Sequence, residues 1–188
     1  MASSLCPAVD RARVEQRVAE WDEVGRELPR LLERLRSSPV YGLGNGRLNP
    51  PGDQHGVYLF TEEGRNLYVG RTGLTERARL AGKPGSSSFL MRLTGHTERD
   101  PGSASFAWRL TMEKALKEVE AGERDPLPKT RKLRVNDPGL VELFRNEQRH
   151  VAAMDFQAVE INDERVSYVF ELYAAWVLET PYNSFATS

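Results

Sequence analysis

The stretch that decides the fold is Gly56–Phe60 (GVYLF) followed by Leu67–Arg71 (LYVGR). Both runs are short and rich in the aromatic and β-branched residues that favour strands. Between them lies Thr61–Gly64 (TEEG) with Arg65 and Asn66, a polar segment containing the glycine that a tight turn favours. The pattern predicts a β-hairpin.

The chain after the hairpin is mostly helical in pattern, with one strand returning near the C-terminal end. One strand that returns after a helical excursion predicts an α+β fold (α/β in the broad sense), with a small three-stranded antiparallel or mixed sheet flanked by helices. In order, we expect a loop at Gly82–Ser88, a short helix from about Phe89, a helix over Ala104–Glu120, a surface loop at Arg124–Lys132, a helix from Asp137-Pro138 to Ala152, a strand over Phe156–Ile161, and a helix over Asp163–Glu179 ended by Thr180-Pro181.

The chain before the hairpin predicts an N-terminal helical extension. Pro29 is expected to kink or restart this helix, and the glycines and prolines of 39–55 predict a linker. The sequence therefore divides into 1–52, a helical extension with its linker, and 53–188, the main domain. We expect the apolar stripe to pack on that domain, with a docking or dimer helix as the alternative. The stripe consists of Val14, Val18, Trp21, Val24, Leu28, Leu31, Leu32 and Leu35.

Bulk composition is that of a soluble globular protein. Hydrophobic residues make up 39% and charged residues 28% of the 188 residues, and the formal net charge is −1, so any footprint for nucleic acid must be local or supplied by a partner. Cys6 is the single cysteine, which excludes an internal disulfide and argues against a structural zinc site. No membrane-length apolar run or signal peptide is visible, and the expected location is the cytoplasm.

Several residues outside the apolar pattern suggest chemistry. Arg71 directly follows the second strand of the hairpin, and Arg92 and His96 lie four apart in a helical stretch, so they share one face. Glu171 interrupts the apolar run YVFELYAAWVL on a side of the helix that carries small residues. The simpler interpretation is a structural one, in which strands use Tyr and Val routinely and Glu171 only meets water.

Taken in order, these residues resemble the GIY-YIG nuclease superfamily from Gly56 to Asn183. Gly56-Val57-Tyr58 is similar to the first signature of the family, and Tyr68-Val69-Gly70 is similar to the second. Arg92-Leu93-Thr94-Gly95-His96 resembles the Arg-x-x-x-His helix, Glu171 the single metal-binding glutamate, and Asn183 the asparagine that closes the motif.

The resemblance implies a metal-dependent endonuclease acting on nucleic acid, with DNA favoured over RNA. Glu171 would bind one divalent ion, Mg²⁺ or Mn²⁺, and Mg²⁺ suits a single carboxylate because it keeps much of its water shell. Arg92 would hold the phosphate. The base would be Tyr58, with Tyr68 beside it, while His96 is a rival because imidazole titrates near neutral pH.

The catalytic arginine has two candidates. In compact family members an Arg lies about ten residues after the tyrosine of the second signature, which falls here beside Arg77 and Arg79; Arg92 is further on and requires an inserted loop around 82–88. We prefer Arg92, because it alone has the following Leu and His. Arg71, Arg77, Arg79 and Asn183 are then expected to bind substrate.

Local charge supports a site for a polyanion, although charged runs are usually solvated faces. From Arg65 to Arg109 there are eight Lys or Arg (65, 71, 77, 79, 83, 92, 99 and 109) against three acids (76, 98 and 100), which gives +5. We expect Tyr58, Tyr68, Arg92 and Glu171 to converge on one concave surface. Alternatives are a catalytically weak nucleic-acid-binding module, or a partner-dependent subunit of a repair, restriction or defence system. A homodimer or protein partner bound through the N-terminal helix is a further expectation.

Overall fold

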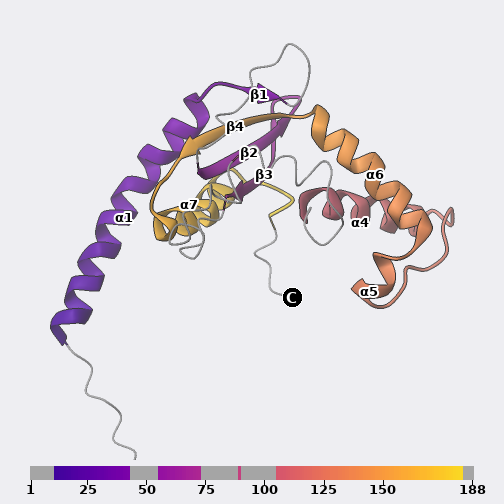
Figure 1. Cartoon of the computed structure of the whole chain (residues 1–188), viewed down its shortest axis with the longest axis horizontal. Helices are drawn as coiled ribbons and strands as arrows, with labels where there is room; N and C mark the ends of the chain where they lie inside the picture. Colours follow the sequence, from indigo (N-terminus) through magenta and orange to yellow (C-terminus); the bar gives the residue numbers. More distant parts are fainter. Residues whose placement is uncertain (1–10, 43–54, 73–88, 90–104, 184–188) are drawn as a thin grey trace, which may run out of the picture.

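A computed structural model describes residues 11–42, 55–72, 89 and 105–183. The predicted loop at 82–88 and nearly all of the short helix from Phe89 lie outside these residues. Along the chain, the elements are α1 (Arg11–Ser37), β1 (Tyr41–Gly42), β2 (Gly56–Glu62), β3 (Arg65–Arg71), α4 (Ser105–Glu120), α5 (Arg131–Arg134), α6 (Pro138–Ala153), β4 (Asp155–Glu160) and α7 (Glu164–Val177) (Figure 1).

The sheet confirms the α+β class and corrects the number of strands. The described strands form one four-stranded sheet in the order β1-β4-β2-β3, and all the pairings are antiparallel. The additional strand is β1, where Tyr41 pairs with Phe156 and Gly42 with Asp155. We expected this segment to be linker, because two residues next to proline and glycine carry no local strand signal.

The hairpin forms as predicted, with longer strands. Its turn places Glu63 and Gly64 at positive φ (50° and 75°), as a two-residue hairpin turn of the mirror-image type requires. Tyr68 pairs with Phe60 but Asn66 pairs with Thr61, so Leu67 is the extra residue of a β-bulge.

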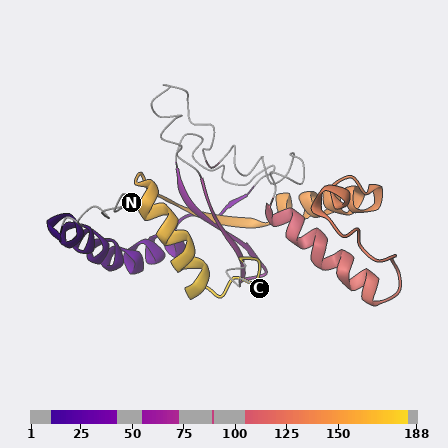
Figure 2. The ribbon, with the colours of Figure 1, turned by 90° about the horizontal axis from the view of Figure 1, so that it is seen from below.

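α1 and α7 pack on one face of the sheet, while α4 and α6 extend away from the sheet as an arm and α4 meets the other face near its first residues (Figure 2). Because neighbouring residues of a strand point to opposite faces, the sheet divides its apolar residues between two cores. One core joins α1 and α7 to Val57, Leu59, Val69 and Val159. The other joins Phe106 and Leu110 of α4 and Phe144 of α6 to Tyr58, Phe60, Tyr68 and Phe156.

Capping residues begin the later helices where the sequence predicts. The Asp137 side chain accepts a 2.8 Å hydrogen bond from the Leu140 amide, and Pro138 stands at the first position of α6. Asp163 caps α7 in the same way, through the Arg165 amide. α7 packs against β2 and β3 through Phe170, Ala174 and Ala175, which positions Glu171.

The two halves of α1 differ in their surroundings. Pro29 does not end the helix, which runs on to Ser37. In the C-terminal half Leu28, Leu31, Leu32 and Leu35 are buried, so this half packs on the sheet as expected. In the N-terminal half Trp21 is 58% exposed. α1 and β1 therefore belong to the same sheet and core as the segments beyond the predicted boundary at 52.

The part of the chain that the structure describes contains no helix with both the length and the apolar character needed to cross a membrane.

Candidate functional site

The glycines of the two hairpin signatures are explained by close packing. Tyr58 pairs with Gly70 across the hairpin, and a Cβ at Gly70 would lie 2.4 Å from both Cζ and Oη of Tyr58. A Cβ at Gly56 would lie 2.0 Å from the carbonyl oxygen of Val159. Real Cβ atoms do not approach other atoms so closely. The ring of Tyr58 therefore lies directly across β3, and its hydroxyl reaches the backbone of the edge strand.

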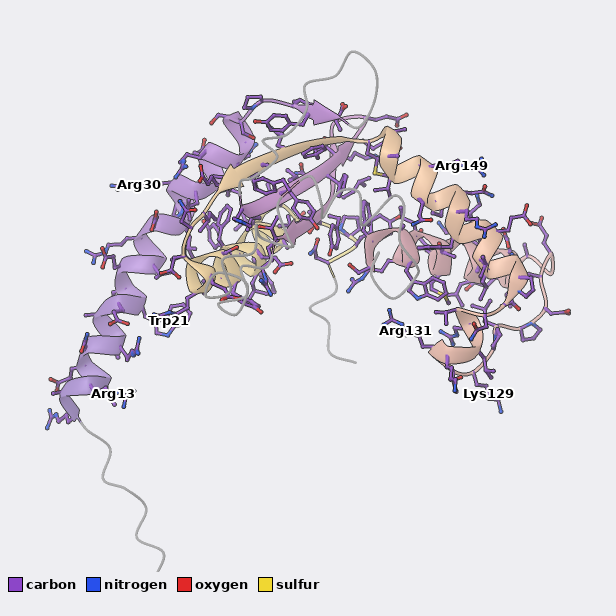
Figure 3. The ribbon with its side chains drawn as sticks, in the orientation of Figure 1. Arg13, Trp21, Arg30, Lys129, Arg131 and Arg149 are labelled. Carbon is purple, nitrogen blue, oxygen red and sulfur yellow. The ribbon has the colours of Figure 1, made fainter. Side chains whose placement is uncertain are left out.

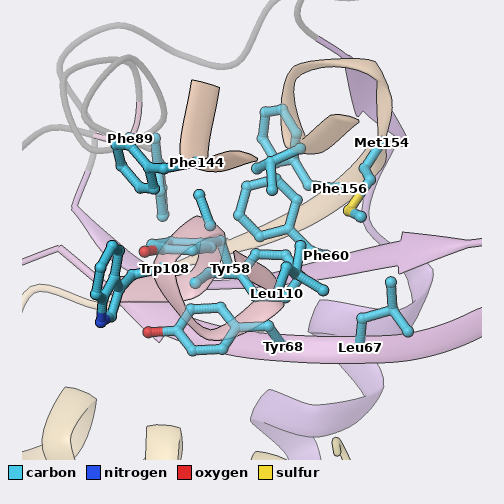
Figure 4. Close-up of a cluster of buried hydrophobic side chains, with 13 residues drawn as sticks. Tyr58, Phe60, Leu67, Tyr68, Phe89, Trp108, Leu110, Phe144, Met154 and Phe156 are labelled. Carbon is cyan, nitrogen blue, oxygen red and sulfur yellow. The ribbon is translucent and has the colours of Figure 1, made fainter. Parts of the chain in front are cut away.

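The two signature tyrosines lie together on the α4 side of the sheet. Figure 4 shows their hydroxyls pointing toward the same side of the buried cluster, beside Trp108. Tyr58 is 1% exposed and Tyr68 is 9% exposed. The Tyr68 hydroxyl lies 3.2 Å from Oγ of Ser105, and its ring stacks on Phe106 with centroids 4.8 Å apart.

Arg71 and Glu171 form a second pair, on the α7 side. Arg71 Nε lies 3.0 Å from Glu171 Oε2, and the two side chains are 19% and 25% exposed. The Arg71 guanidinium also lies over the ring of Tyr168, 3.2 Å from its centroid. Tyr168 stands three residues before Glu171 on α7, so both contact Arg71 from one face of the helix. This spacing was the signal that could have identified Tyr168 from the sequence.

The expectation of one concave surface is not met by the described residues. Tyr58 and Tyr68 are together, and Arg71 and Glu171 are together, but the pairs lie on opposite faces of β3. The reason is strand alternation, because Arg71 is three residues after Tyr68. The two pairs flank the same edge strand. The other predicted site residues, Arg77, Arg79, Arg92 and His96, lie outside the described residues.

Asn183 bonds to the backbone of β3, and its expected contact with substrate stays a prediction. Its Nδ2 donates to the Val69 carbonyl at 2.6 Å, and its Oδ1 accepts from the Val69 amide at 2.7 Å. Thr180 Oγ1 donates to the same Oδ1 at 2.9 Å, and the Tyr182 amide donates to the Leu67 carbonyl at 3.2 Å. The C-terminal segment thus pairs with the outer edge of β3, which would otherwise be unpaired.

Tyr182 is a further tyrosine near the sheet, but it is a poor candidate for a base. Burial, together with a hydrogen bond to Glu113, raises the pKa of Tyr182 to about 12. The hydroxyl therefore stays protonated at neutral pH. Arg109 donates to the Tyr182 carbonyl, which holds this segment against α4.

Glu171, the predicted metal ligand, would have to hold an ion as a single carboxylate. Among the described residues, no group of three or more His, Cys, Asp or Glu side chains could enclose a metal ion. A single, partly exposed carboxylate suits Mg²⁺, which completes its shell with water and substrate oxygens. The Arg71 guanidinium competes for the same carboxylate, so the ion and Arg71 would have to share Glu171.

The chain matches no protein-family model, no curated protein sequence and no solved structure. What the protein does is therefore inferred from the side chains that flank β3 and from the resemblance of its motifs.

Proposed function

We propose that the protein is a metal-dependent endonuclease that hydrolyses phosphodiester bonds in nucleic acid, with DNA as the favoured substrate. The observation that carries the proposal is the position of Glu171. α7 brings this carboxylate to the end of the strand that bears the second signature, where it lies 3.0 Å from Arg71. The first signature reaches the same strand from the other face, through the ring of Tyr58.

In this proposal Glu171 holds one Mg²⁺ or Mn²⁺ ion. A bound divalent ion would polarise the scissile phosphate and support the leaving oxygen. Arg71 is positioned by the Tyr168 ring and by Glu171, so its guanidinium can donate to a phosphate oxygen as well as to the carboxylate. Arg92 remains our proposed phosphate clamp, and Arg77 and Arg79 remain proposed substrate contacts.

The base would remove a proton from the attacking water at the edge of β3. Tyr58 is our first candidate, because its hydroxyl lies against the backbone of Gly70, one residue before Arg71. Tyr68 lies beside it and is bonded to Ser105. His96 remains the alternative base.

A second candidate function is a nucleic-acid-binding module with little or no activity. Two observations favour it. The ion pair with Arg71 neutralises Glu171 without any metal, and Tyr58 is only 1% exposed, which restricts the access of water to its hydroxyl.

A digestion panel separates the two candidates. Single-stranded, duplex, nicked and branched DNA, together with RNA, are incubated with the protein in Mg²⁺ or in chelator. The endonuclease proposal predicts products only in Mg²⁺. Binding that falls steeply with salt but is never followed by cleavage would support the binding module instead.

The same assay decides between the two arginines. Removing a group that stabilises the transferring phosphate costs roughly 10³-fold or more in rate. We expect that loss for Arg92→Ala and a smaller one for Arg77→Ala. Full activity of Arg92→Ala beside an inactive Arg77→Ala would reverse the assignment.

A further inference from the structure

The segment 124–134 (RDPLPKTRKLR) is the most strongly basic part of the described chain. It contains five cations, Arg124, Lys129, Arg131, Lys132 and Arg134, and one acid, Asp125, in a protein of net charge −1. We expected a surface loop here. The structure instead includes the short helix α5 and places the segment at the far end of the arm formed by α4 and α6 (Figures 1 and 2).

The segment is held in place by its own contacts. Arg124 Nε lies 2.7 Å from Oε2 of Glu118, and Arg134 Nε donates to the Pro128 carbonyl at 2.6 Å. Thr130 caps α5, and Leu127 packs on a small core between α4 and α6. Arg124 and Arg134 are therefore engaged in holding the loop.

Three further cations of the segment, Lys129, Arg131 and Lys132, are exposed, and Figure 3 shows Lys129 and Arg131 on different sides of the α5 region of the arm. We call these three residues the basic tip. Three like charges within four consecutive residues repel one another, and a polyanion that binds them relieves the repulsion.

We propose that the basic tip binds the phosphate backbone of double-stranded nucleic acid, away from the point of cleavage. This inference rests on the proposed function for its choice of partner. Lysine and arginine on one surface supply the contacts to phosphate that position a protein on a duplex without reading its sequence.

α4 connects the candidate site to the basic segment. It begins at Ser105, whose Oγ lies 3.2 Å from the Tyr68 hydroxyl, and it ends at Glu120, just before the basic segment. At about 1.5 Å per residue, its 16 residues span about 24 Å, so the end of α4 that leads into the basic segment lies well away from Tyr68.

The test is a binding titration with fluorescent duplex DNA in chelator, repeated across salt concentrations. The variant is Lys129→Ala/Lys132→Ala, and the control is Arg26→Ala/Arg30→Ala, which removes two exposed charges from α1. The logarithm of the binding constant falls as log salt rises, and each lost phosphate contact makes this fall less steep by about 0.9. We expect the tip variant to make the slope less steep by about one to two, and the control to leave it unchanged. Equal slopes for wild type and the tip variant, or the same loss in the control, would overturn the proposal.

Failure here and failure of the endonuclease proposal are distinguishable, because binding in chelator requires no cleavage. If the protein never cuts but shows the expected slopes, the proposal for the basic tip holds and the endonuclease proposal fails. If the protein cuts but wild type and tip variant show equal slopes, the endonuclease proposal holds and the proposal for the basic tip fails.

Discussion

At position 70 the absence of a side chain has a specific use, because the ring of Tyr58 occupies the space that a Cβ would take. The ring cannot easily move aside, since Tyr58 is 1% exposed and surrounded by Phe60 and Phe89. The glycine of the second signature thus serves the tyrosine of the first, and the two motifs form one packed unit across the hairpin.

We predict that Gly70→Ala destabilises the protein by about 1–3 kcal/mol, as overpacking of a filled core does. The matched control is Gly25→Ala on exposed α1, where nothing lies within 4 Å of the new Cβ. That change should be neutral or stabilising by up to about 1 kcal/mol, the helix preference of Ala over Gly. Urea unfolding measures both, and equal midpoints for the two variants would contradict the packing described for Tyr58.

His150 is a second position where one residue has a measurable effect. Its Nε2 lies 2.5 Å from Glu62 Oε1 and its Nδ1 lies 3.2 Å from Glu147 Oε2, while Lys114 Nζ lies 3.4 Å from the other Glu147 oxygen. Burial by itself lowers the pKa of His150. The hydrogen bonds to Glu62 and Glu147 raise it by more, so that the pKa lies above 6.5.

A raised pKa in the folded state means that His150 stabilises the fold when it is charged. This contribution is fully present below about pH 6.5, the value for the unfolded chain, and is lost as the pH rises through the higher folded pKa. We therefore predict that His150→Gln lowers the unfolding midpoint in urea more at pH 5.5 than at pH 8.5. An equal loss at both values would show that protonation of His150 contributes nothing.

At the scale of elements, the outer edge of β3 is closed by the C-terminal segment. Asn183 imitates a neighbouring strand, because one amide group both donates to and accepts from Val69. An edge strand without such a cover would offer its backbone to other chains.

We predict that Asn183→Ala destabilises the protein by about 1–3 kcal/mol, the usual cost of leaving partly buried backbone groups without partners. Nucleic-acid binding by the folded fraction should be unchanged if Asn183 serves only to cover this edge. Asn162→Ala is the control, since Asn162 is exposed and its side chain donates only a long 3.4 Å hydrogen bond to the exposed Glu160 side chain; its effect should stay within about 0.5 kcal/mol. Weakened binding by a fully stable Asn183→Ala protein would support the predicted substrate contact.

An element can be predicted from the sequence when the residues that specify it are neighbours in the chain. We could predict the hairpin, the Asp137 and Asp163 caps and the course of α7, because a turn, a cap and a helical period each depend on nearby residues. β1 could not be predicted, because its two residues become a strand only by pairing with β4, which is distant in sequence. For the site, the sequence identified Arg71 and Glu171, but not that they would lie on the opposite face from the tyrosines.

At the scale of the whole molecule, the sheet joins two arms. The N-terminal half of α1 extends on one side and the α4–α6 arm with its basic tip on the other, with α7 between them (Figures 1 and 2). A long substrate that contacts the basic tip and the strand β3 together would be positioned by the arm, while Glu171 and its neighbours would perform the cleavage.

The most direct test of the proposed activity is Glu171→Gln, compared with Glu164→Gln on the same helix. Glutamine keeps the size of the side chain and one acceptor oxygen, so α7 should stay packed, but it removes the charge that would hold the ion. Cleavage is measured in Mg²⁺, binding in the same buffer with chelator, and folding by thermal unfolding. We predict that Glu171→Gln abolishes cleavage while it retains or slightly tightens binding and keeps its fold, and that Glu164→Gln cuts like wild type. Cleavage by Glu171→Gln at the wild-type rate would contradict the proposed function.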